Sequence, residues 1–354
     1  MIQHASPSAS DSLLPADSLV LVTGAGGFVG GHVARTLASS GYRVRGLCRR
    51  LPKQEPGDPP IDWLVGDIRD PETRRRAVEG AKGVIHTAGW VSLGPDPRNE
   101  SRSINVEATR DLLDNAERSG VERFVHTSTL WTVASGTTAT PADEASAWNL
   151  DLLRSPYCDS KREAETIVLE RARPGFGTMV INPGLVIGIR DVRPTSTRVM
   201  LEMSKVPVAF LPNGGIPFVD ARVLARAHIR AMEMAEPGQR YIVLGRYLSY
   251  LEMASIVSRI AGWPRKVVRI PDGFQSPLRW SADLISRLRL RRTGEISAAA
   301  VSGGFVQLHV SGARADAIFG LTHPSPAASI FEALDDSRRA GRAPWLKSLQ
   351  PIQE

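Results

Sequence analysis

The chain has 354 residues, of which 42% are hydrophobic and 23% are charged, and a formal net charge of +7. This composition is ordinary for a globular protein, and the length fits one large α/β unit or two unequal lobes. No apolar run reaches the roughly 18 residues that a transmembrane helix needs, and the arginines are scattered over helices, so neither a membrane span nor nucleic-acid binding is expected.

The N-terminus and the cysteine content bear on the protein's location. The first 17 residues are rich in Ser, Ala and Pro and lack the basic and apolar regions of a signal peptide, so we expect a disordered tail there. Two cysteines, Cys48 and Cys158, are too few for a disulfide framework. Their number favours a reducing, cytoplasmic setting.

From residue 18 onward, short apolar runs alternate with amphipathic segments. Strands are predicted at 19–22, 42–48, 62–65, 83–87, 123–128 and 177–181, and helices at 28–40, 71–79, 104–119 and 157–171. Strict alternation with nearly continuous apolar strands is typical of a parallel sheet that is covered by helices on both faces. We therefore predict an α/β fold with a doubly wound parallel Rossmann sheet.

Beyond residue 185 the pattern loosens. Helices are expected at 195–205, 223–234 and 250–261 and a strand at 241–244, while the remainder is shorter and less regular. We expect a dinucleotide-binding domain over residues 18–185 and a smaller C-terminal lobe over 186–354 that mainly binds substrate. A segment near 215–245 is expected to return to the first domain.

Residues 280–292 combine apolar side chains with four arginines at helical spacing. Such a basic amphipathic stripe could rest weakly on a membrane surface or close over a site. A helix on the protein surface or a lid is the simpler interpretation.

Three glycines follow the first predicted strand. Gly24, Gly27 and Gly30 lie in the run TGAGGFVG, between a strand and a helix. In this context the first glycine permits a tight turn, the second lets the backbone approach a pyrophosphate, and the third lets helix and strand pack closely. The free amides of the helix start, at Phe28 and Val29, would bind phosphate. The motif predicts a dinucleotide cofactor.

The end of the second strand distinguishes the two nicotinamide cofactors. NAD sites usually place an acid here to bind the ribose hydroxyls, but this chain has Arg49 and Arg50. A guanidinium suits a 2′-phosphate, which an acid would repel. We therefore predict NADP, with NAD as the alternative and two solvated surface arginines as the non-functional interpretation.

Asp67 and Ile68 follow the third strand, on the edge of the sheet where ligands bind. The carboxylate could accept a hydrogen bond from the adenine amino group. The nearby Asp70 precedes Pro71, which is the pattern of a helix N-cap.

Tyr157 and Lys161 are four residues apart on a predicted helix, and therefore share one face. A lysine one turn away can lower the pKa of a phenol, which can then exchange a proton with a carbonyl or alcohol while hydride moves. Alone, such a pair is routine on a helix surface. Its position is more informative, because it follows a strand that ends in the hydroxyls of Thr127, Ser128 and Thr129.

Taken in order, these motifs resemble an extended short-chain dehydrogenase/reductase over residues 19–262. The resemblance rests on the glycine turn, Gly66-Asp67-Ile68, Ile85-His86-Thr87-Ala88, Asn105-Val106, the hydroxyl triplet, Tyr157 to Lys161, Asn182-Pro183-Gly184 and Phe218 to Arg222. It implies that Thr129, where most members have Ser, binds the substrate oxygen, with Ser128 in reserve. It also implies that Tyr157 is the general acid/base and that Lys161 binds the nicotinamide ribose.

The resemblance further implies a set of residues that line the cofactor: Thr87, Ala88, Thr127, Pro183 and Val186. Arg49 and residues 182–188 resemble the dihydroflavonol-reductase-like and 3β-hydroxysteroid-dehydrogenase-like members. An apolar or aromatic ligand would suit the side chains expected at the pocket, which are Trp90, Val91, Trp131 and Trp148.

Three functions are therefore compared. The first is an NADP-dependent ketone or alcohol oxidoreductase that acts on a largely apolar small molecule. The second is a nucleotide-sugar epimerase or dehydratase, because a basic lobe suits a pyrophosphate. The third is a non-enzymatic dinucleotide sensor, although such members commonly lack the Tyr or the Lys. A homodimer is compatible with the sequence.

Two further groups of residues favour ordinary structural roles. His86 and His126 end strands without suitably spaced partners, so no metal site is expected. Asp143 and Glu144 lie in a loop that borders the substrate in this fold, and could cap residues 145–152.

Overall fold

The computed structural model describes residues 14–192, 197–262, 266–287 and 297–352. Seven parallel strands form the central sheet in the order β10-β6-β5-β4-β1-β2-β3. They are β1 (Leu19–Thr23), β2 (Arg43–Cys48), β3 (Asp62–Val65), β4 (Gly83–His86), β5 (Arg123–Thr127), β6 (Gly177–Pro183) and β10 (Arg240–Val243). The strand order reverses between β1 and β4, so the predicted doubly wound α/β fold is confirmed.

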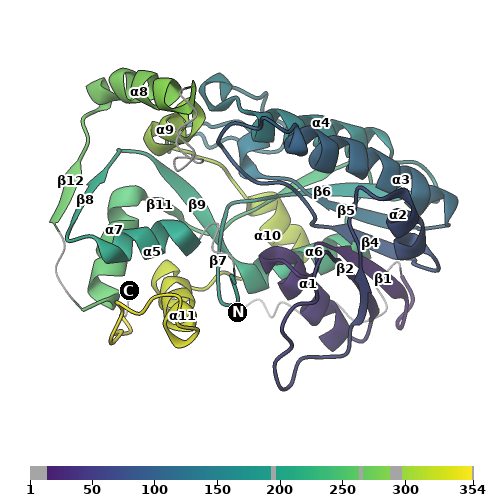
Figure 1. Ribbon diagram of the computed structural model, residues 1–354. Helices are drawn as coiled ribbons and strands as arrows, with labels where there is room; N and C mark the ends of the chain where they lie inside the picture. Colours follow the sequence, from purple (N-terminus) through teal and green to yellow (C-terminus); the bar gives the residue numbers. More distant parts are fainter. Residues whose placement is uncertain (1–13, 193–196, 263–265, 288–296, 353–354) are drawn as a thin grey trace, which may run out of the picture.

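Helices cover both faces of this sheet (Figure 1). One face carries α1 (Phe28–Ser39) and α6 (Ala221–Met234), and the other carries α2 (Pro71–Val78), α3 (Ala108–Arg118) and α4 (Pro156–Glu170). Alternating side chains of β1 enter two separate cores: Val20 and Val22 pack with α1 and α6, whereas Leu21 packs with α2 and α3. The apolar strands are therefore buried on both sides, as their sequence predicts.

The predicted helix 104–119 has a different start. A π-helical turn, Arg102–Glu107, precedes α3. The Asn105 side chain in this turn bonds to both backbone groups of Trp90, accepting from its N–H at 2.7 Å and donating to its carbonyl at 3.0 Å. We attribute the local widening of the helix to this side-chain link, which periodicity alone does not reveal.

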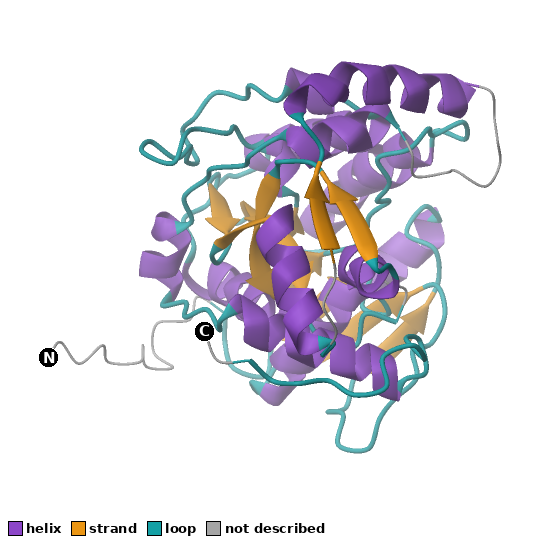
Figure 2. Ribbon diagram, turned by 90° about the vertical axis from the view of Figure 1, so that its left-hand side faces the viewer, coloured by secondary structure: helices purple, strands orange, loops and turns teal. Residues whose placement is uncertain are grey.

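The smaller lobe contains two short sheets and most of the remaining helices. Its elements are β7 (Leu185–Ile187), β9 (Gly215–Asp220), β11 (Tyr247–Ser249), β8 (Val208–Leu211), β12 (Lys266–Arg269), α5 (Thr197–Lys205), α7 (Tyr250–Ile260), α8 (Gln275–Arg287), α9 (Ala298–Phe305) and α11 (Pro326–Arg339). Helix α10 (Ala313–Phe319) packs instead against α6 and β10 of the central sheet. Four of these strands have only three or four residues, too few to show a period, and the six residues of β9 are all buried and show no alternation, so none of the five is predicted from the sequence. Figure 2 shows α8 and α9 stacked at one end of the molecule.

The chain passes between the smaller lobe and the domain of the central sheet more than once. After β7 and β9 in the smaller lobe, α6 packs against α1 and β10 pairs with β6 in the central sheet. The segment 221–243 therefore lies in the domain of the central sheet (Figure 1).

The ends of two predicted segments differ in the structure. Leu14 is buried in the core that lies beneath α1, and Ser18 donates to the Pro15 carbonyl at 2.7 Å, so folded chain already begins within the predicted tail. Residues 1–13 lie outside the described residues. The basic stripe lies on α8 only up to residue 287, and residues 288–292 are likewise outside. Over the described ranges, no helix is long and apolar enough to cross a membrane.

Candidate active site

The glycine turn joins β1 to α1 at the carboxyl edge of the sheet. Gly24 has φ +69°, a conformation that favours glycine. A Cβ on Gly30 would lie 2.3 Å from the Gly24 carbonyl oxygen and 2.5 Å from Thr87 Oγ1, so only glycine lets helix and strand approach this closely. Gly27 is the N-cap residue, and no side chain caps the helix. Its first amides are thus available to a phosphate.

Hydrogen bonds tie β1 to β4 beside this turn. Thr87 Oγ1 donates to the Thr23 carbonyl at 2.7 Å, and the Ala88 amide donates to Thr23 Oγ1 at 3.2 Å. Thr23 Oγ1 also pairs with His86 Nδ1 at 2.7 Å. Burial lowers the pKa of His86 to about 3, so this imidazole is neutral. Thr87 and Ala88 are therefore held at the strand edge where the chain switches direction.

The end of β2 presents the two arginines. Arg49 and Arg50 are exposed, and neither guanidinium forms a hydrogen bond or salt bridge with another described residue. Asp67 is engaged instead by Arg69, whose Nη2 and Nε lie 2.7 and 3.1 Å from the carboxylate oxygens. These bonds lower the pKa of Asp67, and the charge of Arg49 lowers it slightly further.

This pairing shows how the acid is held. The Asp67 carboxylate binds a neighbouring guanidinium two residues along the chain, and its hydrogen bond from an adenine amino group stays a prediction. Ile68 is buried in the core and would contribute by packing. Asp70 accepts from the Thr73 amide at 2.8 Å, which confirms it as the N-cap of α2.

Helix α4 presents Tyr157 at its first turn. Ser155 caps the helix by accepting from the Cys158 amide at 3.2 Å, and Pro156 occupies the first turn, as suits a helix start. The Tyr157 side chain is buried, and the hydroxyl of Thr129 lies near it. Burial raises the pKa of Tyr157 well above its ordinary value, while the Thr129 hydroxyl lowers it in part.

Lys161 lies one turn further along and points to the end of β5. Its Nζ donates to the Thr127 carbonyl at 2.5 Å and lies 3.2 Å from His126 Nε2. Burial lowers the pKa of Lys161 to about 8. The expected lowering of the Tyr157 pKa by Lys161 is not found, because the ammonium is directed at the strand end and burial dominates at the phenol.

The three hydroxyl side chains at the end of β5, those of Thr127, Ser128 and Thr129, point in different directions. Thr127 Oγ1 bonds to His228 Nε2 of α6 at 2.7 Å, so only the Thr127 carbonyl faces Lys161. The Thr127 side chain is thus directed toward α6, and the predicted contact of Thr127 with the cofactor stays a prediction. Ser128 Oγ donates to Glu165 at 2.7 Å and lies beneath the site. Thr129 is the one that reaches Tyr157, which favours it over Ser128.

The remaining predicted residues lie around these groups. Pro183 ends β6 and Val186 is buried in β7. A Cβ on Gly188 would lie 3.6 Å from the Phe28 ring, so this segment passes beside the first turn of α1, where Val29 is half-buried.

Trp148 and Trp131, two of the residues expected at the pocket, are half-buried and pack on the same small core cluster. Trp148 Nε1 donates to the Trp131 carbonyl at 3.1 Å, and the Arg162 guanidinium lies 3.8 Å from the Trp148 ring centroid. Helix α9 closes against Trp131, since a Cβ on Gly303 would be 3.0 Å from its ring. Of the other two expected pocket residues, Trp90 is half-buried and Val91 is exposed.

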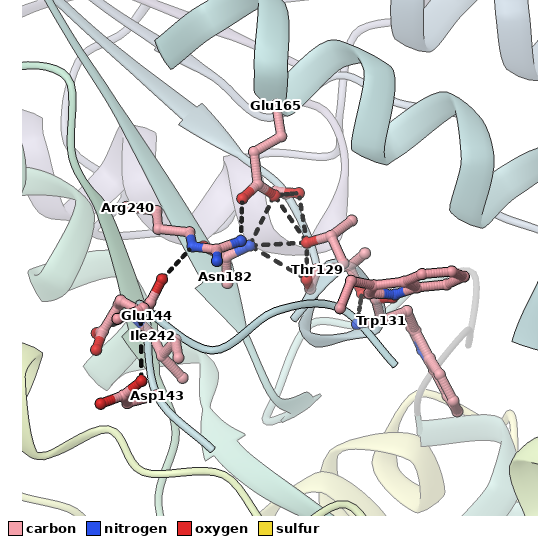
Figure 3. A network of polar contacts seen from close by, with 12 residues as sticks. Thr129, Trp131, Asp143, Glu144, Glu165, Asn182, Arg240 and Ile242 are labelled. Carbon is pink, nitrogen blue, oxygen red and sulfur yellow. Dashed lines mark hydrogen bonds and ion pairs between the residues drawn. The ribbon is translucent and has the colours of Figure 1, made fainter. Parts of the chain in front are cut away.

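Sequence reasoning missed a buried acid on the same helix face. Glu165 follows Lys161 by four residues, and its carboxylate accepts from Ser128, Thr132, Asn182 and Arg240 (Figure 3). Tyr157, Lys161 and Glu165 thus occupy successive turns, a spacing that the sequence does display. Glu144, expected to be a cap, instead accepts from the Ile242 amide at 3.0 Å.

This edge fits a dinucleotide cofactor. A Cβ at Gly24 or Gly30 would fill the cradle of the turn, the start of α1 offers uncapped amides, and two unpaired cations flank it at the end of β2. Thr129, Tyr157 and Lys161 lie on the strands and helix that follow. Such an arrangement can bind a nicotinamide cofactor and deliver a proton beside it.

Comparison with known proteins agrees with this geometry. Residues 20–245 match the NAD dependent epimerase/dehydratase family. The chain belongs to this family. The resemblance to extended short-chain dehydrogenase/reductases is thereby confirmed, and the protein is an NAD(P)-dependent enzyme of this type.

Individual relatives extend over most of the chain. A Synechocystis sp. protein named after dihydroflavonol 4-reductase is 29% identical over 89% of this chain and 92% of its own. The 3 beta-hydroxysteroid dehydrogenase/Delta 5-->4-isomerase of Mycobacterium tuberculosis is 31% identical over 77% of this chain and 76% of its own. The crystal structure of gox2253 superposes with a TM-score of 0.78 at 27% identity and covers 92% of this chain and 99% of that one.

Proposed function

We propose that the protein is an NADP(H)-dependent oxidoreductase that interconverts a carbonyl and a hydroxyl group on a largely apolar small molecule. The observation that carries this proposal is the placement of the buried Thr129 and Tyr157 side chains next to each other, one helical turn from Lys161 and at the sheet edge that holds the glycine turn. A phenol at this place can exchange a proton with a substrate oxygen that the threonine hydroxyl also contacts.

The cofactor supplies or accepts the hydride when bound. The chain's own residues do the rest: the glycine turn and the start of α1 bind the pyrophosphate, and Lys161 holds the nicotinamide ribose. Thr129 orients the substrate oxygen, and Tyr157 donates its proton to that oxygen during reduction. Because burial raises the pKa of Tyr157, the phenol keeps its proton at neutral pH, which suits the reductive direction.

The nature of the substrate is inferred from two tryptophans near the site and from the names of the relatives. Trp131 and Trp148 offer large apolar faces beside α9. The relatives are named for a dihydroflavonol and a hydroxysteroid, which are polycyclic molecules. We therefore propose a polycyclic or aromatic ketone or alcohol as the substrate class.

The central test is turnover by a Tyr157→Phe variant. We expect NADPH consumption with a panel of steroid and flavanone ketones in the wild type, and a loss of at least about 100-fold in kcat in the variant, because the proton donor is gone. The dissociation constant for NADPH should not change. Tyr42→Phe is the matched control. Tyr42 bonds to Glu233 at 3.1 Å and directly precedes β2, whereas the proposed site lies at the carboxyl ends of the strands.

Two outcomes would contradict the proposal. Wild-type turnover by Tyr157→Phe would remove the phenol from the mechanism. Conversion of a nucleotide sugar without net NADPH consumption would replace the reductase by an epimerase that uses the same side chains.

The cofactor preference is tested at Arg49. An exposed guanidinium that binds a 2′-phosphate contributes about 1.5 to 3 kcal/mol, so Arg49→Ser should raise the dissociation constant for NADPH by about 10-fold or more. The value for NADH should stay the same. Isothermal titration with both cofactors measures this difference. Arg43→Ser, at the exposed start of β2, serves as the control. An equal effect on both cofactors would contradict NADP selectivity.

A further inference from the structure

Glu165 is a buried carboxylate just beneath the proposed catalytic threonine. Its side chain is 5% exposed. One carboxylate oxygen accepts from Ser128 Oγ at 2.7 Å, Thr132 Oγ1 at 2.7 Å and Asn182 Nδ2 at 2.8 Å, and the other accepts from Arg240 Nη1 at 3.2 Å. Figure 3 shows Asn182 of β6 and Arg240 of β10 directed at the acid, while Ser128 follows β5 and Thr132 lies in the helical turn Leu130–Thr132.

The same donors hold the backbone of Thr129. Its carbonyl oxygen lies 2.7 Å from Thr132 Oγ1 and 3.3 Å from Asn182 Nδ2, and it also accepts from the Thr132 amide at 3.2 Å. Asn182 Nδ2 further donates to Thr132 Oγ1 at 2.9 Å. The single Thr132 hydroxyl proton is shared between this carbonyl and the Glu165 carboxylate, and Asn182 Nδ2 shares its two protons among three acceptors, so both side chains that contact the carbonyl also contact Glu165.

Arg240 extends the network to the loop before α4. Its Nε donates to the Glu144 carbonyl at 2.9 Å, while the Glu144 carboxylate accepts from the Ile242 amide at 3.0 Å. That loop carries Trp148, one of the two tryptophans proposed to contact the substrate. The pair of Glu165 and Arg240 thus connects this loop to the end of β5, where Thr129 lies.

We propose that Glu165 is a positioning residue that, through Thr132 and Asn182, fixes Thr129 beside Tyr157. The inference rests on the proposed reductase function. A carboxylate suits this place because it only accepts hydrogen bonds, and four donors meet there. An amide of the same shape would present its own N–H groups to a donor. A shift of about 1 Å at a catalytic group is enough to cost up to about 100-fold in rate.

The first experiment compares Glu165→Gln with Glu163→Gln. Glu163 lies on the same helix and pairs at the surface with Arg102 at 2.9 Å and Arg110 at 3.6 Å. We expect Glu165→Gln to lower kcat about 10- to 100-fold, with KM changed less and the NADPH dissociation constant unchanged. Glu163→Gln should behave as the wild type. A folded Glu165→Gln variant with wild-type kcat would overturn the proposal.

A double variant shows whether Glu165 acts through Thr129. If it does, Glu165→Gln should cause little further loss of kcat in a Thr129→Ala background, because the group being positioned is already absent. A merely structural role would lower activity equally in both backgrounds, and that result would overturn the proposal.

Thr132 provides a milder test in case Glu165→Gln does not fold. Thr132→Val keeps the shape but removes the hydroxyl that joins Glu165 to the Thr129 carbonyl, whereas Thr132→Ser keeps that hydroxyl. We expect kcat to fall at least about tenfold in the first and less than about threefold in the second, on the same positional argument. Equal kcat values would overturn the proposal.

Hydrogen exchange separates this inference from the proposed function. The Thr132 amide, which donates to the Thr129 carbonyl, should exchange faster in Glu165→Gln than in Glu163→Gln. If the wild type reduces no carbonyl compound, the reductase function fails, but faster exchange still supports positioning by Glu165. Equal exchange in the two variants would overturn it.

Discussion

Burial sets the chemistry of Tyr157 and Lys161 in opposite directions. It raises the pKa of the phenol and lowers that of the ammonium to about 8, because each uncharged form is favoured away from water. The four-residue spacing correctly places both side chains on one helix face, but the expected effect of one on the other does not follow. Lys161 binds a carbonyl at the strand end, and Thr129 modulates the phenol instead.

A pH effect on stability follows from Lys161. Its pKa is about 8 in the folded protein and about 10.5 when unfolded, so between these values the unfolded chain binds a proton that the native state does not. The free energy of unfolding should therefore rise with pH in this window, by about 2 kcal/mol between pH 8 and pH 10 relative to Lys161→Met. Urea unfolding of both proteins across this range measures it.

Lys82→Met is the control for this effect. Lys82 is exposed and pairs with Glu122 at 2.8 Å. Its replacement should leave the pH dependence as in the wild type. A constant difference between wild type and Lys161→Met from pH 8 to pH 10 would show that the ammonium is not held in a desolvated site.

At the scale of elements, the first strand, turn and helix act as one unit. The turn places the start of α1 at the sheet edge, and this depends on the close approach of Gly30 to Gly24 and Thr87. The structural requirement is local, which is why three glycines in the sequence are enough to predict it. The lengths of the predicted helices and longer strands agree with the structure to within a few residues for the same reason.

Gly30→Ala should disrupt this unit. The new methyl group would lie 2.3 Å from a backbone oxygen, so the turn must move, and we expect the NADPH dissociation constant to rise at least about 100-fold by loss of several phosphate contacts. Fluorescence titration with NADPH gives the value.

Gly31→Ala is the matched control on the same helix. Its methyl group would meet first the flexible end of Arg35, at 3.1 Å. NADPH affinity should change less than about threefold, since no contact of the turn is lost. Equal weakening in both variants would contradict the specific role of Gly30.

In the molecule as a whole, the Asp220 carboxylate links the domain of the central sheet to the smaller lobe. Asp220 ends β9 and caps α6 by accepting from the Arg222 amide at 2.8 Å, and it also accepts from Ser329 Oγ of α11 at 2.8 Å. Arg222 in turn pairs with Glu332 of α11 at 2.7 Å. The helix that returns to the central sheet is thereby bonded to the C-terminal helix of the smaller lobe.

Asp220→Ala should weaken this link. Loss of the cap and of the buried bond to Ser329 is expected to lower the free energy of unfolding by about 2 kcal/mol. Urea unfolding at pH 7 provides the measurement. Asp272→Ala removes an acid that is 65% exposed and pairs with Arg269, and should cost less than about 0.5 kcal/mol. Equal effects of the two substitutions would show that Asp220 carries no special link.

Features that depend on neighbours within one turn or one strand can be predicted from the amino-acid sequence. These are the glycine turn, the alternation that gives the sheet, the two arginines after β2 and the shared face of Tyr157 and Lys161. Each is a matter of spacing along a regular element, and a period of two or 3.6 residues is visible without any partner.

The directions in which the polar groups of the site point depend on how the chain packs in three dimensions. Thr127 turns to His228, 101 residues away, and Glu165 gathers Ser128, Asn182 and Arg240 from three strand ends. Such buried donors and acceptors choose partners by proximity after packing, because leaving one unpaired costs more than any local preference. The spacing of these residues along the chain therefore does not predict which partners they take.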